Sequence, residues 1–266
     1  MRTALSLLAL LVFAPIAHAK LEISNIQLAH GVLGPERKSL ECYPLDELVF
    51  RFVVNGVKLD GEGRTDLELA FKLMNSDGKA VIDQKGPIQR PLMLGGNTFS
   101  AHTTIGIGAG APAGEYKLIV TIRDKQTSET ATFERTLTCK PSQFQILAPR
   151  FYRDAESKVP AGTSGVAGES IYFRIKAVGY DRTQNKVSAT MTMQVLNDRG
   201  EEMLTKPMVV NAELTRPEDV QKAMQLNFNG AVGLNRPGQY KLRIMVQDHI
   251  SKQTATYETA LKVEMP

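Results

Sequence analysis

The strands that decide this fold are encoded twice, in two segments that match along their whole length. Residues 112–134 read PAGEYKLIVTIRDKQTSETATFE, and residues 236–258 read RPGQYKLRIMVQDHISKQTATYE. Tyr116 and Tyr240 are 124 positions apart, and the other matching residues of the two segments keep the same separation. A fixed separation held over two whole segments indicates one structural unit that is present twice.

Alternating apolar residues upstream of these segments repeat with nearly the same separation. The first pair of such runs spans residues 48–54 and 171–177, and the second pair spans residues 67–73 and 191–195. Alternation with a period of two places every apolar side chain on one face, as a half-buried strand requires. Tight turns follow the second runs, because Asn and Gly in the tetrapeptides NSDG and NDRG tolerate positive φ.

The repeat predicts an all-β chain of two tandem β-sandwiches. Two units of about 120 residues, each with about seven strands and a turn about every 8–12 residues, are typical of immunoglobulin-like sandwiches. A linker at Pro141 places the first sandwich in residues 20–141 and the second in residues 142–266. The units differ after their middle strands, where residues 83–100 lack a regular pattern and residues 214–225 predict one or two turns of helix.

Residues 1–19 have the three parts of a secretory signal peptide. Arg2 gives a charged start, residues 4–13 are an apolar run, and Ala17 and Ala19 form a small-x-small cleavage site. The run is shorter than the roughly 18 apolar residues of a membrane span, and no later stretch reaches that length. No Cys follows the run closely, which disfavours a lipid anchor. We therefore expect an exported, soluble protein, periplasmic or secreted, whose mature chain begins at Lys20.

The charge of the chain does not favour nucleic-acid binding. Lys and Arg total 32 against 28 Asp and Glu, which gives a formal charge of +4, and removal of Arg2 with the signal peptide leaves +3. This surplus is spread along the chain, and no run of Lys or Arg could follow a phosphate backbone. We expect no nucleic-acid partner.

The two cysteines, Cys42 and Cys139, both lie in the first unit. An even pair in an exported protein favours a disulfide. The two positions are 97 apart, and closing such a loop stabilises a fold by roughly 4–5 kcal/mol, less any strain. A reactive thiol is the alternative, but neither Cys has a nearby His or a partner motif.

The Gly-x-Tyr-x-Leu start of each quoted segment resembles the tyrosine corner of immunoglobulin-like and fibronectin III-like domains. This resemblance implies that the hydroxyl groups of Tyr116 and Tyr240 bond back to the backbone near the start of their strands. Leu118 and Leu242 stand where an antibody-type domain has its second core Cys, and the chain has no Trp. The resemblance is to the paired modules of exported bacterial proteins, and it implies a binding or spacing role.

An enzyme is not expected. After removal of residues 1–19 the histidines are His30, His102 and His249, and none has the spacing of metal ligands. No serine has the Gly-x-Ser-x-Gly setting of a nucleophile elbow. Adjacent carboxylates such as Glu201 and Glu202 face opposite sides of a strand and do not form an acid/base pair. We therefore expect no catalytic residue, metal or cofactor.

The remaining hypothesis is a non-catalytic interaction or structural module whose partner is another envelope or extracellular protein. Recognition by sandwiches is concentrated in loops carried on the rigid sheets. Residues 214–225 form the one element that the second unit has and the first lacks, so we expect the contact there. Its candidate residues are Leu214, Arg216, Glu218, Asp219, Lys222 and Gln225.

Two alternatives stay open. A chaperone-like protein would cover the edge strand of a client and anchor its C-terminus on basic residues, for which Arg150 and Arg153 near the linker are available. A carbohydrate-binding sandwich would need exposed aromatic side chains, and with no Trp the spare aromatics are Phe151, Tyr152 and Tyr180. These three have packing between the units as their simpler explanation.

Overall fold

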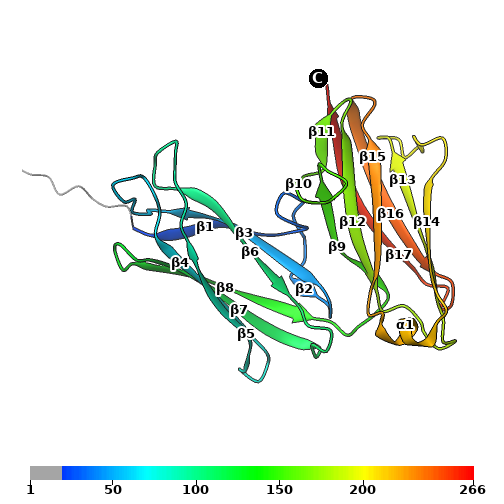
Figure 1. The fold of residues 1–266 in the computed structure, drawn as a ribbon, viewed down its shortest axis with the longest axis horizontal. Coiled ribbons are helices and arrows are strands. Elements are labelled where there is room, and N and C mark those ends of the chain that lie inside the picture. Colours follow the sequence, from blue (N-terminus) through cyan, green and yellow to red (C-terminus); the bar gives the residue numbers. More distant parts are fainter. Residues whose placement is uncertain (1–19) are drawn as a thin grey trace, which may run out of the picture.

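Strands make up most of the chain in the computed structural model, which describes residues 20–266 (Figure 1). The predicted signal peptide, residues 1–19, lies outside the described residues. The strands form four sheets, two before the predicted linker and two after it. Within the described range, no helix is both long and apolar enough to cross a membrane.

Residues 22–139 form two sheets that we name together the first sandwich. Its strands are β1 (Glu22–Ala29), β2 (Glu41–Cys42), β3 (Glu47–Asn55), β4 (Leu67–Met74), β5 (Ala80–Ile88), β6 (Phe99–Gly106), β7 (Gly114–Asp124) and β8 (Thr130–Cys139). They pair in the orders β1-β3-β6 and β2-β8-β7-β4-β5, antiparallel except for β2 with β8. Phe50 and Phe52 of β3 point between the sheets and meet Phe133 of β8, with ring centroids 6.4 and 5.5 Å away.

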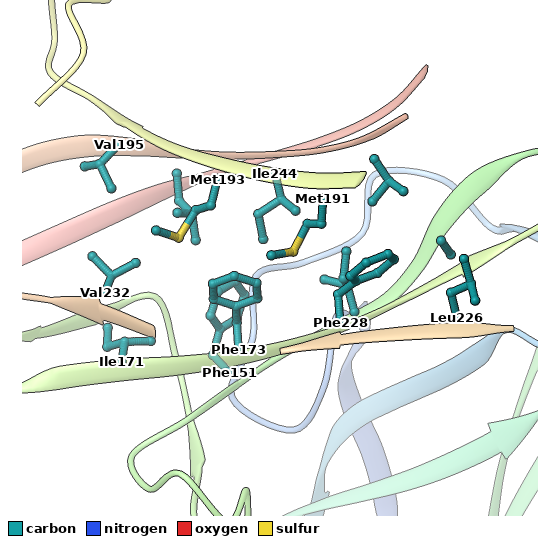
Figure 2. Close-up of a cluster of buried hydrophobic side chains, with 14 of the residues drawn as sticks. Phe151, Ile171, Phe173, Met191, Met193, Val195, Leu226, Phe228, Val232 and Ile244 are labelled. Atoms are coloured by element: carbon teal, nitrogen blue, oxygen red, sulfur yellow. The ribbon is translucent and has the colours of Figure 1, made fainter. Parts of the chain in front are cut away.

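Residues 145–264 form two further sheets, the second sandwich. Its elements are β9 (Gln145–Tyr152), β10 (Pro160–Ala161), β11 (Ser164–Val166), β12 (Ser170–Val178), β13 (Val187–Leu196), β14 (Met208–Leu214), α1 (Pro217–Lys222), β15 (Leu226–Gly233), β16 (Gly238–Asp248) and β17 (Thr254–Glu264). The sheets have the orders β10-β9-β12-β15 and β11-β17-β16-β13-β14. Figure 2 shows Phe173 and Phe228 of one sheet facing Met191 and Ile244 of the other, in a core of apolar side chains.

The sequence repeat corresponds to a repeat of strand pairing. In the hairpin of β7 and β8, Tyr116 pairs with Leu137, and in the hairpin of β16 and β17, Tyr240 pairs with Leu261. The parallel pair of β2 with β8 likewise has its counterpart in β11 with β17. The predicted all-β, immunoglobulin-like sandwich fold is thereby confirmed.

The aspartates that end β7 and β16 are buried and hold their turns through the backbone. Asp124 accepts hydrogen bonds from the N–H groups of Gln126 at 2.8 Å and Lys58 at 2.9 Å. Asp248 accepts them from Ile250 at 2.9 Å and Asp181 at 2.8 Å. Burial raises the pKa of Asp248, but these hydrogen bonds to its ionised form outweigh burial and leave its pKa lowered. Each aspartate thus ties a distant loop to its hairpin.

One sequence expectation was wrong and one was confirmed where the two units differ. Residues 83–100 were expected to be irregular, but residues 99 and 100 begin β6 and residues 83–88 belong to β5, which pairs with β4 at the edge of its sheet. Most of its side chains are exposed, so no apolar alternation marks it, and Gly86 and Pro87 interrupt the strand pattern. The expected helix in residues 214–225 is α1, which lies at one end of the second sandwich (Figure 1).

Candidate functional site

The two cysteines lie side by side but unbonded. Cys42 of β2 and Cys139 of β8 are direct partners in the parallel pair, and both side chains are buried free thiols. The structure therefore does not contain the predicted disulfide, which stays a prediction, although it brings its two members together. Burial and the neighbouring Cys139 raise the pKa of Cys42 to about 12. A thiol held protonated in this way is a poor nucleophile, which disfavours the reactive-thiol alternative.

The two corner tyrosines bond to the backbone four residues upstream. The hydroxyl of Tyr116 donates to the carbonyl of Pro112 at 3.0 Å, and that of Tyr240 donates to the carbonyl of Arg236 at 3.0 Å. Gly238 has φ +155°, and a Cβ there would lie 3.1 Å from the Tyr240 ring, so glycine leaves room for the corner. Both tyrosines have the geometry of a structural corner.

Residues 214–225 close the end of the second sandwich. Val220 of α1 is buried in the core, and the hydroxyl of Tyr180 donates to the carbonyl of Ala223 at 2.7 Å. Arg216 pairs with Asp219 at 2.6 Å. Among the predicted contact residues, Leu214, Asp219 and Gln225 are half-buried, and Arg216, Glu218 and Lys222 are exposed. The segment therefore has a packing role, and its role in contacts stays a prediction.

A different surface gathers polar side chains around one hollow. It lies where the start of β3 meets the outward face of β9, β12 and β15, and its cavity volume is about 440 Å³. We name it the joint cleft. Its polar and aromatic lining residues are Glu47, Arg150, Tyr152, Arg174, Lys176, Asn227 and Asn229.

The strand register explains why these side chains meet. Arg174 of β12 pairs with Arg150 of β9 on one side and with Asn229 of β15 on the other. Lys176, two residues further along β12, is opposite Asn227. Residues two apart on a strand point to the same face, so Arg174, Lys176 and their partners on β9 and β15 all project away from the core. The core side of the same strands carries apolar side chains such as Phe173.

Positive charge exceeds negative charge in the joint cleft. Glu47 forms ion pairs with both Arg150 and Lys176. Arg174 has no carboxylate within ion-pair distance among the described residues: its guanidinium lies 5.8 Å from the centroid of the Tyr152 ring and donates to the carbonyl of Glu156 at 3.2 Å. Three cations thus line the cleft with one carboxylate, and the guanidinium of Arg174 is the group left for an incoming anion.

The pKa of Glu47 reflects this surplus. Burial raises the pKa of Glu47, but the hydrogen bond from Lys176 and the charges of Arg150 and Lys176 outweigh burial, so the pKa lies below its usual value. Glu47 is therefore ionised at neutral pH and links β3 of the first sandwich to β9 and β12 of the second.

Apolar contacts also form between the two sandwiches beside the cleft, in the contact region that we name the joint. Leu147, Ala148 and Val178 form a small buried cluster against Tyr43 and Leu45 of the first sandwich. Next to it, at residue 179, a glycine with φ +69° passes so close to the linker backbone that a Cβ would lie 2.2 Å from the carbonyl oxygen of residue 143. The cluster packs the second sandwich against the first beside the cleft, and the close approach at residue 179 packs the turn after β12 against the start of the second unit.

The loop after β1 makes a second contact across the joint. His30 packs edge-on against Tyr257 of β17, with ring centroids 5.4 Å apart. Burial and the charge of Arg37 lower the pKa of His30 to about 4, so this imidazole is neutral at physiological pH. In residues 20–266, no group of three or more His, Cys, Asp or Glu side chains could hold a metal ion.

The residues named for the two alternatives have divided roles. Arg153 is paired with Glu169 at 2.7 Å, whereas Arg150 lines the joint cleft. Phe151 is buried in the second core and Tyr180 supports α1, so neither is a free aromatic surface. Of the three aromatic residues Phe151, Tyr152 and Tyr180, Tyr152 is the one that lines the joint cleft.

Sequence reasoning missed most of the joint cleft. A signal was present: Arg174 and Lys176, and likewise Asn227 and Asn229, are polar pairs two residues apart within strand patterns. Such pairs identify the outward face of a strand, but they do not show which residues of the other sandwich lie against that face. The convergence with Glu47 depends on how the two sandwiches pack, which the repeat does not encode.

Comparisons with known proteins give no family for this chain. No family model matches it, and no curated protein matches it. Among solved structures, red sea bream transglutaminase is 9% identical over 92% of this chain, with a TM-score of 0.29, and the match spans 31% of that enzyme. The C-terminal domain of the Streptococcus agalactiae AgI/II polypeptide BspA is 9% identical over 90% of this chain and 99% of that domain, with a TM-score of 0.31. Likenesses at this level carry no argument about function.

Proposed function

We propose that this chain is a non-catalytic, exported binding protein that contacts its partner through the joint cleft. The observation that carries the proposal is the guanidinium of Arg174, which has no carboxylate partner among the described residues and lies beside a hollow with more cations than carboxylates. The polar groups that converge there are carried on paired strands of one sheet, and side chains placed on such a scaffold lose less conformational freedom on binding than side chains on a loop.

The partner proposed is another envelope or extracellular component. This part of the proposal depends on the predicted signal peptide, and the predicted disulfide belongs to the same oxidising compartment. Catalysis is not part of the proposal, because the pKa of about 4 makes the half-buried His30 a weak base and the protonated Cys42 is a poor nucleophile.

The joint cleft is preferred to residues 214–225 for one physical reason. The exposed charges of Arg216, Glu218 and Lys222 carry both signs and project from a short cap, whereas the cleft residues surround a hollow. Solvated charges of mixed sign contribute little to affinity, but groups that converge on one ligand act together.

The test is capture from the native cell envelope with the mature chain, residues 20–266, and three variants. Arg174→Ala should lose the captured partner, and Arg123→Ala, which removes an exposed arginine on the outward face of β7, should keep it. A third variant replaces Arg216, Glu218 and Lys222 with serine and keeps the buried Val220. Loss of the partner in this third variant alone would refute the cleft and support residues 214–225.

The same capture tests the chaperone-like alternative. The joint cleft contains Arg150, one of the two arginines proposed to anchor a client C-terminus, but its pairing with Glu47 leaves it less available. Recovery of many unfolded exported proteins in place of one stoichiometric partner would favour the chaperone-like function.

A further inference from the structure

We propose that the joint cleft recognises an acidic glycan, specifically an oligosaccharide that carries uronate-type carboxylates. This inference rests on the proposed function of the cleft and names its ligand class. Three features support it: a guanidinium with no carboxylate partner among the described residues, two amide side chains beside it, and tyrosine rings on the same sheet face.

The carboxylate of the sugar binds Arg174. A guanidinium presents planar paired donors that match both oxygens of a carboxylate, and charge-assisted bonds of this kind are about twice as strong as neutral ones. Arg174 is exposed and free of any carboxylate among the described residues. Its packing against the Tyr152 ring limits the side-chain freedom that binding would otherwise remove. Lys176 and Arg150 add positive charge on the neighbouring positions.

The hydroxyl groups of the sugar bind the amides of β15. Asn227 and Asn229 are exposed, lie two residues apart and face the same side as Lys176 and Arg174. An amide offers two N–H donors and a carbonyl acceptor, as a ring of sugar hydroxyls requires. The carbonyl oxygen of Asn227 already accepts a hydrogen bond from the side chain of Gln225 at 2.9 Å, which leaves its N–H donors for the sugar. Cations alone would suit any anion, so the two amides are the feature that selects a polyhydroxylated one.

Two tyrosines extend the surface along the same face. Tyr152 and Tyr172 are direct register partners on β9 and β12, and both are half-buried; the guanidinium of Arg174 lies over one face of the Tyr152 ring. Tyrosine supplies a flat apolar body with a polar tip, which suits a sugar ring whose faces are C–H groups and whose rim is hydroxyl groups. A linear oligosaccharide lying across the strands would meet the rings and the cations together.

An acidic peptide fits this surface less well. Peptides bind sheets chiefly by adding a strand to a free edge, or by placing apolar side chains in pockets. The backbone of β12 is already paired on both sides, with β9 and with β15. Of the residues that line the joint cleft, only Ala148 and Ile175 are aliphatic. Side-chain recognition of a polar ligand is what remains.

The experiment measures binding of trigalacturonate to the mature chain by titration calorimetry, with its methyl ester as the uncharged control. We expect trigalacturonate to bind about tenfold or more tightly than the ester, since the ester cannot accept the charge-assisted bonds. Arg174→Ala should lose about tenfold in affinity for trigalacturonate and Asn229→Ala severalfold, while Arg123→Ala should not change it. Affinity should also fall as salt rises.

Three results would overturn the glycan proposal. The first is equal binding of acid and ester, and the second is no effect of Arg174→Ala. The third is tighter binding of a triglutamate peptide than of trigalacturonate, which would assign the cleft to acidic peptides. If no probe binds but Arg174→Ala still loses the captured envelope partner, the glycan inference fails and the proposed function stands. If neither depends on Arg174, both fail.

Discussion

Replacement of Glu47 by glutamine tests the joint and the cleft together. Glu47 pairs with both Arg150 and Lys176, and the side chains of Glu47, Arg150 and Lys176 are 26%, 31% and 24% exposed. Fully exposed pairs contribute about 0.2–1 kcal/mol each, and removing one partner of a buried pair costs about 3–5 kcal/mol. The contribution of these two partly exposed ion pairs should lie between those two ranges, so we expect Glu47→Gln to lower the free energy of unfolding by about 1–2 kcal/mol at pH 7.

The pH dependence of this loss has a definite sign. Because the pKa of folded Glu47 lies below its usual value of 4.5, ionised Glu47 stabilises the fold above that value and ceases to do so as pH falls through the folded pKa. The difference between wild type and Glu47→Gln should therefore be full at pH 7 and shrink below pH 4.5.

The assay is urea unfolding followed by far-ultraviolet circular dichroism, with the cysteines in one oxidation state throughout. Glu134→Gln is the matched control, because its pair with Lys117 at 2.7 Å is about half exposed and lies within the first sandwich. We expect this control to change stability by less than about 1 kcal/mol. The same stability for Glu47→Gln and wild type at pH 7, or a difference unchanged at pH 3, would show that ionised Glu47 does not stabilise the contact between the sandwiches.

Three further predictions concern the scaffold. In protein exported to an oxidising compartment, Cys42 and Cys139 should form a disulfide, which intact mass and the absence of free thiol after unfolding would show. Reduction of this disulfide should lower the free energy of unfolding by about 3–5 kcal/mol. Free thiols in the exported protein would contradict the prediction. Val220→Ala should destabilise the protein by about 2 kcal/mol in thermal or urea unfolding, since Val220 is buried in the second core; an effect near zero would show that α1 does not support it. Tyr116→Phe should lower the free energy of unfolding by about 1–2 kcal/mol and Tyr240→Phe by less, because Tyr116 is buried and Tyr240 is not. A larger loss for Tyr240→Phe than for Tyr116→Phe would count against the corner geometry.

Much of the fold was predictable because the information is local and is given twice. The alternation in residues 48–54 and 67–73 gives strands whose apolar faces meet, and the hairpins that contain Tyr116 and Tyr240 recur with one separation. The edge strand β5 was missed because an exposed strand needs no apolar face, so its pairing with β4 leaves no pattern in its own sequence.

The candidate site was largely unpredictable for a different reason. Arg174 and Asn229 are ordinary outward residues until the second sandwich packs against the first and brings Glu47 beside them. That packing depends on small apolar contacts around Ala148, and the repeat says nothing about how its two copies meet. The predicted contact at residues 214–225 followed from a real difference between the units, but a difference in structure need not be a binding site.

The most direct measurement is an arginine footprint of the mature chain, free and with its captured envelope partner, using a dicarbonyl reagent and mass spectrometry. Arg174 in the joint cleft and Arg216 before α1 are both exposed in the free chain, so both should be modified there. We expect the partner to protect Arg174 and to leave Arg216 reactive. Protection of Arg216 with Arg174 still reactive would contradict it.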